Sequence, residues 1–320
     1  MKNLLLVCLV ASVAAFPSFN VESVIREARP AANPVTIAKF ASWMVQFEKA
    51  YETKEETVVR FDAFLGTLEK IASLTEEAKG LTTYGLNQFS DLTWAEFKAK
   101  HLQKGEIPAI PESEIPYQNV SKPRQFNHPD NWDWRRSNII TPVKNQGSCG
   151  ACWAFATVSV VEAMAAKEGK GSHSYAEQQM HAFGYAKDNG LPNESDYPYT
   201  QKKGSCHSTN IAVKLSNMVQ INSNEEDMAN SLTDGGPFAI AFKVGNAFQH
   251  YSGGIMTSTD CDNENSWHAI AMVGYGIDNG NKFWIGKNQW GTGWGESGFF
   301  RARRGSSWCK VDFSPVTGWI

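Results

Sequence analysis

Apolar residues recur at helical spacing in the first third of the chain. Four of them stand at positions i, i+3, i+4 and i+7, the spacing of one face of an amphipathic helix: Phe40, Trp43, Met44 and Phe47. A second apolar stripe follows the capping-box sequence Thr53-Lys-Glu-Glu56 and comprises Phe61, Phe64, Leu65, Leu68, Ile71 and Ala72. Thr93-Trp-Ala-Glu96 has the same capping-box form and predicts a short helix through Lys100. Together these patterns predict a small helical module over about residues 36–100.

The second half of the chain carries mainly strand patterns. Four segments are rich in alternating apolar or β-branched residues: 238–243, 268–275, 282–287 and 298–303. The run from Trp153 to Ala166 is apolar on most faces, which is typical of a buried helix. These patterns predict an α+β fold, in which a helical half packs against a twisted, antiparallel, barrel-like sheet.

Between these two regions, residues from about Gln103 to Gln125 are proline-rich, mixed in charge and without an apolar period. Such a stretch is typical of a linker or of an extended segment that docks on another surface. The residues alone leave two alternatives open for the front part of the chain. It is either an independent N-terminal domain or a helical module with an extended tether.

Composition and the first residues indicate the compartment. The chain has 320 residues and a net charge of -3, which argues against a nucleic-acid partner. A basic start at Lys2, an apolar run to Val13 and the small residues Ala14 and Ala15 have the form of a signal peptide cleaved after Ala15. A membrane anchor needs roughly 20 apolar residues, more than this run contains. We therefore expect a protein of the secretory pathway with no membrane anchor.

The cysteines point to a reactive thiol. Once Cys8 of the signal peptide is set aside, five remain: Cys149, Cys152, Cys206, Cys261 and Cys309. An odd number in an oxidising compartment leaves one thiol unpaired. Cys152 stands where a glycine-rich loop meets the helix predicted from Trp153, so it should lie in the first helical turn. The partial positive charge of a helix N-terminus lowers a thiol pKa, which suits a nucleophilic role. A buried or disulfide-bonded cysteine is the alternative that these residues alone leave open.

The stretch from Asn145 to Phe155, NQGSCGACWAF, resembles the active-site signature of papain and the cathepsins. The resemblance implies that Cys152 is the nucleophile and that Gln146 helps to form the oxyanion hole. HAIAMVGYG, which begins at His268, and FWIGKNQWG, which contains Asn288, resemble the family's histidine strand and asparagine loop. They imply that His268 is the acid/base and that Asn288 orients it.

Other positions of the resemblance concern the surroundings of these groups. Trp290 would shield the Asn288–His268 hydrogen bond and line the leaving-group side of the cleft. Gln289 stands where the family usually has serine, and we expect little consequence. Ala241 and Ser314 match positions of the substrate pocket. Neither a metal nor a cofactor is required for the implied acyl transfer.

The front part of the chain resembles a cathepsin L-type propeptide. The spaced helix motif is matched by Glu56, Arg60, Phe64 and Ile71, although Thr67 and Thr75 replace two asparagines of the longer motif. The G-x-N-x-F-x-D motif is matched by Gly85, Asn87, Phe89 and Asp91. The resemblance implies that residues 117–125 run through the cleft until cleavage near residues 126–128. Protonation of carboxylates that hold this propeptide is the expected acid trigger.

One loop of the family pattern is missing. His268 follows Cys152 by 116 residues (268 − 152), whereas the family spacing is about 130 to 150. The absent C-N-G-G region lies after Tyr175-Ala-Glu-Gln178, and we predict one continuous helix over residues 176–188 instead. By resemblance Cys261 pairs with Cys309. Because the usual partners of Cys149 and Cys206 are lost, these two are predicted to pair with each other.

The predicted organisation is a signal peptide (1–15), an inhibitory propeptide (16–126, with its helical module over about 36–100 and its tether over about 103–125) and a papain-like peptidase domain (127–320) with a helical left and an antiparallel β-barrel-like right domain. The predicted function is that of a monomeric cysteine endopeptidase, secreted or sent to a lysosome or vacuole as a zymogen. Its predicted partners are protein or peptide substrates, its own propeptide and cystatin-like inhibitors. The alternatives are a weakly catalytic homologue that binds peptides or inhibitors, and a propeptide that acts alone as an inhibitor. Asn119 and Asn193 are candidate glycosylation sites.

Overall fold

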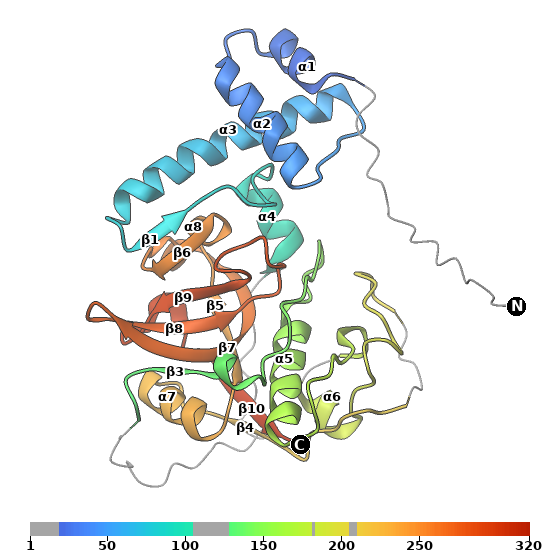
Figure 1. Ribbon diagram of the computed structural model, residues 1–320, viewed down its shortest axis with the longest axis vertical. Helices are drawn as coiled ribbons and strands as arrows, with labels where there is room; N and C mark the ends of the chain where they lie inside the picture. Colours follow the sequence, from blue (N-terminus) through green and yellow to red (C-terminus); the bar gives the residue numbers. More distant parts are fainter. Residues whose placement is uncertain (1–18, 105–127, 181–182, 205–209) are drawn as a thin grey trace, which may run out of the picture.

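The computed structural model describes residues 19–104, 128–180, 183–204 and 210–320. Three helices form a module at one end of the molecule, α1 (Val21–Ala28), α2 (Pro34–Gln46) and α3 (Lys54–Glu77) (Figure 1). Each begins at a side chain that accepts a hydrogen bond from the first turn: Asn20, Asn33 and Thr53. The sequence patterns did not predict α1, which is short and buries only Val24 and Ile25.

This module has its own aromatic core. Phe40, Trp43 and Met44 of α2 are buried against Phe61 and Phe64 of α3, as the two apolar stripes predicted. The second stripe was wrong at its end. Ala72 is exposed and Leu74 is buried instead, because α3 extends beyond the module and meets the rest of the protein near its C-terminus.

The chain then leaves the module and joins the main sheet. It forms β1 (Thr82–Tyr84), which pairs with β6, then α4 (Trp94–His101) and finally β2 (Gln103–Lys104), which pairs with β7. Thr93 and Glu96 complete a capping box at the start of α4, as predicted. Because two of its strands belong to the sheet of the main body, residues 19–104 are not an independent domain.

The sheet forms the larger half of the main body. Its strands lie in the order β1, β6 (Tyr251–Met256), β9 (Phe299–Arg303), β8 (Asn281–Lys287), β7 (Ser266–Asp278), β5 (Phe238–Lys243), β10 (Val316–Trp319) and β4 (Asn217–Gln220), while β3 (Trp132–Asp133) also pairs with β7. The four predicted strands correspond to β5, β7, β8 and β9. All described pairs are antiparallel except β6 with β9, which are parallel.

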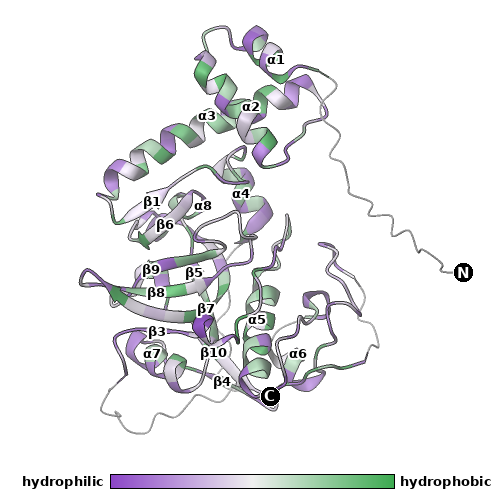
Figure 2. Cartoon of the chain, viewed as in Figure 1, coloured by the Kyte–Doolittle hydropathy of each residue, from purple (hydrophilic) through white to green (hydrophobic). Residues whose placement is uncertain are grey.

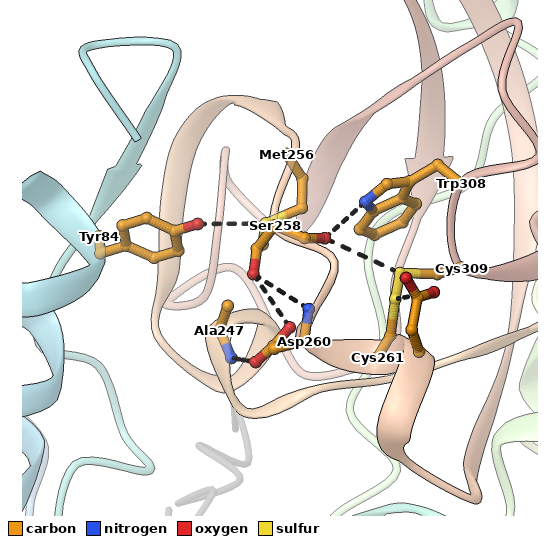
Figure 3. Close-up of a disulfide and its surroundings, with 9 residues drawn as sticks. Tyr84, Ala247, Met256, Ser258, Asp260, Cys261, Trp308 and Cys309 are labelled. Carbon is orange, nitrogen blue, oxygen red and sulfur yellow. Dashed lines mark hydrogen bonds between the residues drawn. A yellow bond between two sulfur atoms is a disulfide. The ribbon is translucent and has the colours of Figure 1, made fainter. Parts of the chain in front are cut away.

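Short helices complete this half: η1 (Trp134–Ser137), α7 (Glu225–Asp234), α8 (Asn246–Gln249), η3 (Asp260–Asn263) and η4 (Trp308–Lys310). Cys261 of η3 and Cys309 of η4 form the predicted disulfide (Figure 3). Next to it, the carboxylate of Asp260 accepts a hydrogen bond from the backbone of Ala247 in α8 at 2.7 Å. The disulfide thus holds the loop that fixes α8.

The helical half is built on α5 (Cys152–Lys167), η2 (Glu177–Gln179) and α6 (Phe183–Asp188). Figure 2 shows α5 hydrophobic over most of its length, and twelve of its residues are buried, most of them in the core that it shares with the sheet. The prediction of one helix over residues 176–188 was wrong. Met180 has an extended backbone (φ −82°, ψ 132°), and Ala176 donates its amide to Pro192 at 3.1 Å, so tertiary contacts outweigh local helix propensity here.

The structure describes only one of the remaining two cysteines. Cys149 carries a free thiol and is half-buried, and Cys206 lies outside the described residues. Their pairing therefore stays a prediction. Among the helices of the described residues, none is both long and apolar enough to cross a membrane.

Candidate active site

Cys152 is the first residue of α5, as predicted, and its side chain is fully buried. The preceding loop has little freedom. Gly147 has φ +60°, and a Cβ there would collide with the Gln201 side chain, whose Oε1 accepts the amide of Ser148 at 3.1 Å. This loop sets Cys152 at the helix N-terminus, facing the start of β7.

His268 and Asn288 meet because β7 and β8 are antiparallel. The start of β7 and the end of β8 lie at the same edge of the sheet, and His268 Nε2 lies 2.8 Å from Asn288 Oδ1. Both side chains are buried. The backbone amide of Gln289 also donates to Asn288 Oδ1, at 2.9 Å, which fixes that oxygen as an acceptor. His268 Nε2 therefore carries a proton, and Nδ1, which has no partner among the described residues, is left as the base.

Trp290 lies against the imidazole of His268. Its ring lies 4.6 Å from that of His268 and is 1% exposed. On other sides it contacts Phe89 and Phe97 of the N-terminal segment, at 5.5 and 5.2 Å between ring centroids. The ring of Trp290 thus lies between the imidazole of His268 and the N-terminal segment, and its role as a shield stays a prediction.

Gln146 is bound to the N-terminal segment. Its Nε2 donates to the backbone carbonyl of Cys149 at 2.6 Å and to that of His101 at 3.2 Å. In return, the ring of His101 is 3.0 Å from the carbonyl of Gly147 through Nδ1, and Gln103 Nε2 donates to the carbonyl of Gly150. The group predicted to bind an oxyanion therefore holds a carbonyl of the chain's own N-terminal part.

Burial sets the charge state of the thiol and the imidazole in this state. Burial raises the pKa of Cys152 to about 11, although hydrogen bonds from Ala269 and from the Gln103 side chain oppose the rise. Burial likewise lowers the pKa of His268 to about 4, against the hydrogen bond to Asn288. Both groups are neutral at pH 7 in this state, and a thiolate–imidazolium pair is disfavoured.

The sequence analysis missed a buried ionic cluster, which joins Lys144 in the segment before Cys152 to α5 and η2. Lys144 Nζ contacts carboxylate oxygens of Glu162 at 2.7 Å and Glu177 at 2.6 Å, while Lys287 Nζ donates to Thr141 Oγ1 at 2.9 Å. Burial raises the pKa of Glu177 to about 8 and lowers that of Lys287 to about 8. The available signal was Glu162, a charged residue inside an otherwise apolar helical run.

The other predicted site residues have more ordinary surroundings. Ala241 is 8% exposed and pairs with Ala269, next to the histidine, and Ser314 accepts a hydrogen bond from Gln220 at 3.5 Å. Asn193 is half-buried and donates to Asp196 at 3.4 Å. Asn119 lies outside the described residues, as does the stretch 117–125 that was predicted to occupy the cleft. In the described chain it is residues 101–103 that lie against Gln146 and Cys152.

The chain matches two family models. Residues 128–319 match the papain family cysteine protease model, and residues 40–97 match the cathepsin propeptide inhibitor domain. The chain belongs to the papain family of cysteine proteases. Its N-terminal segment is an inhibitory propeptide, and the protein is a cysteine endopeptidase with the organisation of a zymogen.

Individual relatives agree with this assignment. Cysteine proteinase 3 of Solanum lycopersicum is 36% identical over 299 residues, which cover 85% of this chain and 82% of the relative. The cathepsin L-like proteinase of Fasciola hepatica is 37% identical over 257 residues, covering 72% and 78%. The solved procathepsin L2 of the Tenebrio molitor larval midgut has a TM-score of 0.81 and 29% identity, covering 89% of this chain and 100% of that one.

The propeptide motif acts at the boundary with the protease. Asn87 Nδ2 donates to the carbonyl of Gln249 at 2.7 Å, and Gly85 N donates to that of His250 at 2.9 Å. Asp91, in contrast, is bound within the propeptide, to Lys49 at 3.1 Å and Tyr51 at 2.8 Å. The asparagine and the glycine dock the propeptide on the end of α8, and the aspartate stabilises the propeptide itself.

Proposed function

We propose that Cys152, His268, Asn288 and Gln146 carry out the peptide hydrolysis of this family. The observation that supports these roles best is the pairing of His268 Nε2 with Asn288 Oδ1 at 2.8 Å, since it leaves Nδ1 unprotonated on the ring. A second support is the carbonyl of His101 bound to Gln146 Nε2, because a substrate carbonyl would need the same donor.

In the proposed reaction, proton transfer from the thiol of Cys152 to His268 Nδ1 produces the thiolate. The sulfur attacks the peptide carbonyl, and Gln146 Nε2 and the backbone amide of Cys152 stabilise the oxyanion. His268 then gives its proton to the departing amine, and the C–N bond breaks to leave a thioester. His268 next removes a proton from water, which attacks the thioester and releases the acid and the Cys152 thiol.

We also propose the earlier boundaries: a signal peptide over residues 1–15, the propeptide to residue 126 and the protease from residue 127. The matched ranges 40–97 and 128–319 support them. Passage through the secretory pathway to a lysosome or vacuole, or out of the cell, accords with that leader. We further propose that Ala241 and Ser314 contact the substrate, that cystatin-like proteins inhibit the enzyme and that the enzyme is a monomer.

The test compares three full-length chains after acid treatment: the wild type, Cys152→Ala and Cys149→Ser. Hydrolysis of a fluorogenic peptide is expected in the wild type and in Cys149→Ser, and its complete loss is expected in Cys152→Ala. The Cys149 variant is the control, since it removes the second free thiol of the described chain. Activity that survives in Cys152→Ala would refute the assignment of the nucleophile.

A further inference from the structure

The side chain of Gln289 lies against the histidine of the site. It is 4% exposed, and its Nε2 is 3.2 Å from His268 Nε2. The same Nε2 donates a hydrogen bond to the backbone carbonyl of Ala269 at 2.8 Å. That bond orients the amide with its NH₂ group, rather than its oxygen, toward the imidazole.

The assignment of donors and acceptors makes this contact unusual. Asn288 Oδ1 accepts from the amide of Gln289 at 2.9 Å and faces His268 Nε2 at 2.8 Å, so the histidine nitrogen is the donor. The NH₂ group of Gln289 can only donate hydrogen bonds. The protonated Nε2 of His268 therefore meets an acceptor on Asn288 and a second donor on Gln289.

These two neighbours act on the imidazole in opposite directions. A carbonyl oxygen next to an N–H stabilises the charged ring, whereas the positive end of an amide N–H destabilises it. Both effects are strong here because His268, Asn288 and Gln289 are all buried, away from the screening of water. The backbone of Gln289 also touches the other catalytic group, since its carbonyl accepts the amide of Gln146 at 2.9 Å.

We propose that Gln289 is a positioning residue that makes His268 less basic and so narrows, from the alkaline side, the pH range in which the thiolate–imidazolium pair exists. The inference rests on the proposed roles of Cys152 and His268. It reverses our expectation that glutamine at this position has little consequence. Because Gln289 acts through His268, it is expected to change the pH dependence of the reaction rather than the binding of substrate.

The test uses Gln289→Met, which keeps most of the volume and removes the donor. Full-length chains are processed at acid pH, with added wild-type enzyme where a variant is slow to process itself. The rate of Cys152 alkylation by iodoacetate is then followed against pH and mapped by peptide mass, because this anionic reagent favours enzyme with a protonated imidazole. The alkaline limb should move up by about half to one pH unit, with KM for a peptide nearly unchanged.

Thr317→Val is the matched control. Thr317 is also buried and donates to a backbone carbonyl, that of Pro237 at 2.9 Å, so this variant loses a comparable hydrogen bond elsewhere. Its alkaline limb should coincide with that of the wild type. An alkaline limb in Gln289→Met that stays at the wild-type pH, or moves down, overturns the proposal, and if this variant fails to fold, Gln289→Ser is judged by the same criterion.

The proposed function can fail separately from this inference. If peptide cleavage by the wild type survives complete alkylation of Cys152, or survives the Cys152→Ala substitution, the catalytic assignment is wrong. If both of those results are as expected and only the alkaline limb fails to move, the role of Gln289 is wrong.

Discussion

The two halves of the protease domain are held in different ways. The sheet half has the Cys261–Cys309 disulfide, and residues 82–97 of the propeptide pack on it through β1 and the buried side chains of Phe89 and Phe97. The helical half has the free thiol of Cys149, and its described contacts with the propeptide are those of residues 101–103 with the loop before Cys152. Among the described residues, the half that carries the nucleophile is therefore the less constrained of the two.

The site itself lies on the seam between the halves, which is polar. Gln146 donates its amide to Gln289, Gly291 donates its amide to Lys144 at 3.0 Å, and Lys287 reaches Thr141 across the same boundary. The hydrogen bonds across this boundary align the reacting groups, whereas the disulfide acts at a distance, on the loop that fixes α8. Loss of a disulfide in one half need not disturb the alignment.

The largest effect is expected from removing the disulfide of the sheet half. The bond links residues 48 apart in sequence, and a loop of that size is worth about 4 kcal/mol of unfolding free energy in the chain-entropy account. Cys261→Ser with Cys309→Ser should lose that amount in urea unfolding, measured in the Cys152→Ala background to prevent processing. A loss below about 1 kcal/mol would mean that the loop is held equally well without the bond.

Next in size is the propeptide contact on the sheet half. Phe97 is fully buried against Phe89, Trp94, His101 and Trp290. Phe97→Ala should weaken docking by about 3 kcal/mol, so that the propeptide is released at higher pH. Processing followed by intact mass from pH 7 to 4 measures the shift. Val35 of α2 is exposed, so Val35→Ala is the control. An equal shift of the processing pH in Val35→Ala would contradict the docking role of Phe97.

His101 of the propeptide gives a smaller effect on docking, and this effect depends on pH. Burial lowers the pKa of His101 from 6.5 to about 4, so docked His101 is neutral while released propeptide takes up a proton below pH 6.5. Docking is thus full above pH 6.5 and weakens as the pH falls toward 4, with a loss of about 2 kcal/mol for this group at pH 5. Burial also lowers the pKa values of His250 and His268 to about 4.

His101→Asn should therefore move processing to lower pH, since asparagine can still donate to Gly147 and does not titrate. Exposed His173→Asn is the matched control. If the processing profile of His101→Asn is identical to that of the wild type, His101 is not the trigger. Protonation of carboxylates, as first expected, would then explain the release of the propeptide.

The smallest effect should come from the helical half. Cys149→Ser is expected to change the free energy of unfolding by less than about 0.5 kcal/mol, because the thiol is free in the structure. The measurement is urea unfolding beside the disulfide variants. A loss of several kcal/mol would instead establish the predicted bond between Cys149 and Cys206.

Much of this molecule could be predicted from sequence where the signal is local. The apolar stripes of α2 and α3, the capping box at Thr93 and the four central strands follow from side-chain periodicity. The resemblance supplied the residues that the structure brings together, His268 with Asn288 and Cys152 with its helix.

The remainder depends on contacts between distant residues. Met180 interrupts a sequence compatible with a helix because Ala176 and its neighbours bind another segment, and the Lys144–Glu162–Glu177 cluster joins residues without any common pattern. Nothing local in the sequence shows that Gln103 reaches Cys152, or that Gln289 turns toward His268.

If the propeptide keeps a complete active site inactive, Cys152 should become reactive when the propeptide is removed, and labelling of this cysteine is the direct test. The full-length chain is treated with iodoacetamide at pH 7 before and after acid processing, and the modified cysteines are mapped. Half-buried Cys149 should react in both samples and serves as the internal standard. Cys152, buried and with its pKa raised to about 11, should react only after processing, together with the onset of peptide cleavage. Equal labelling of Cys152 in both samples, or none after processing, would contradict the account.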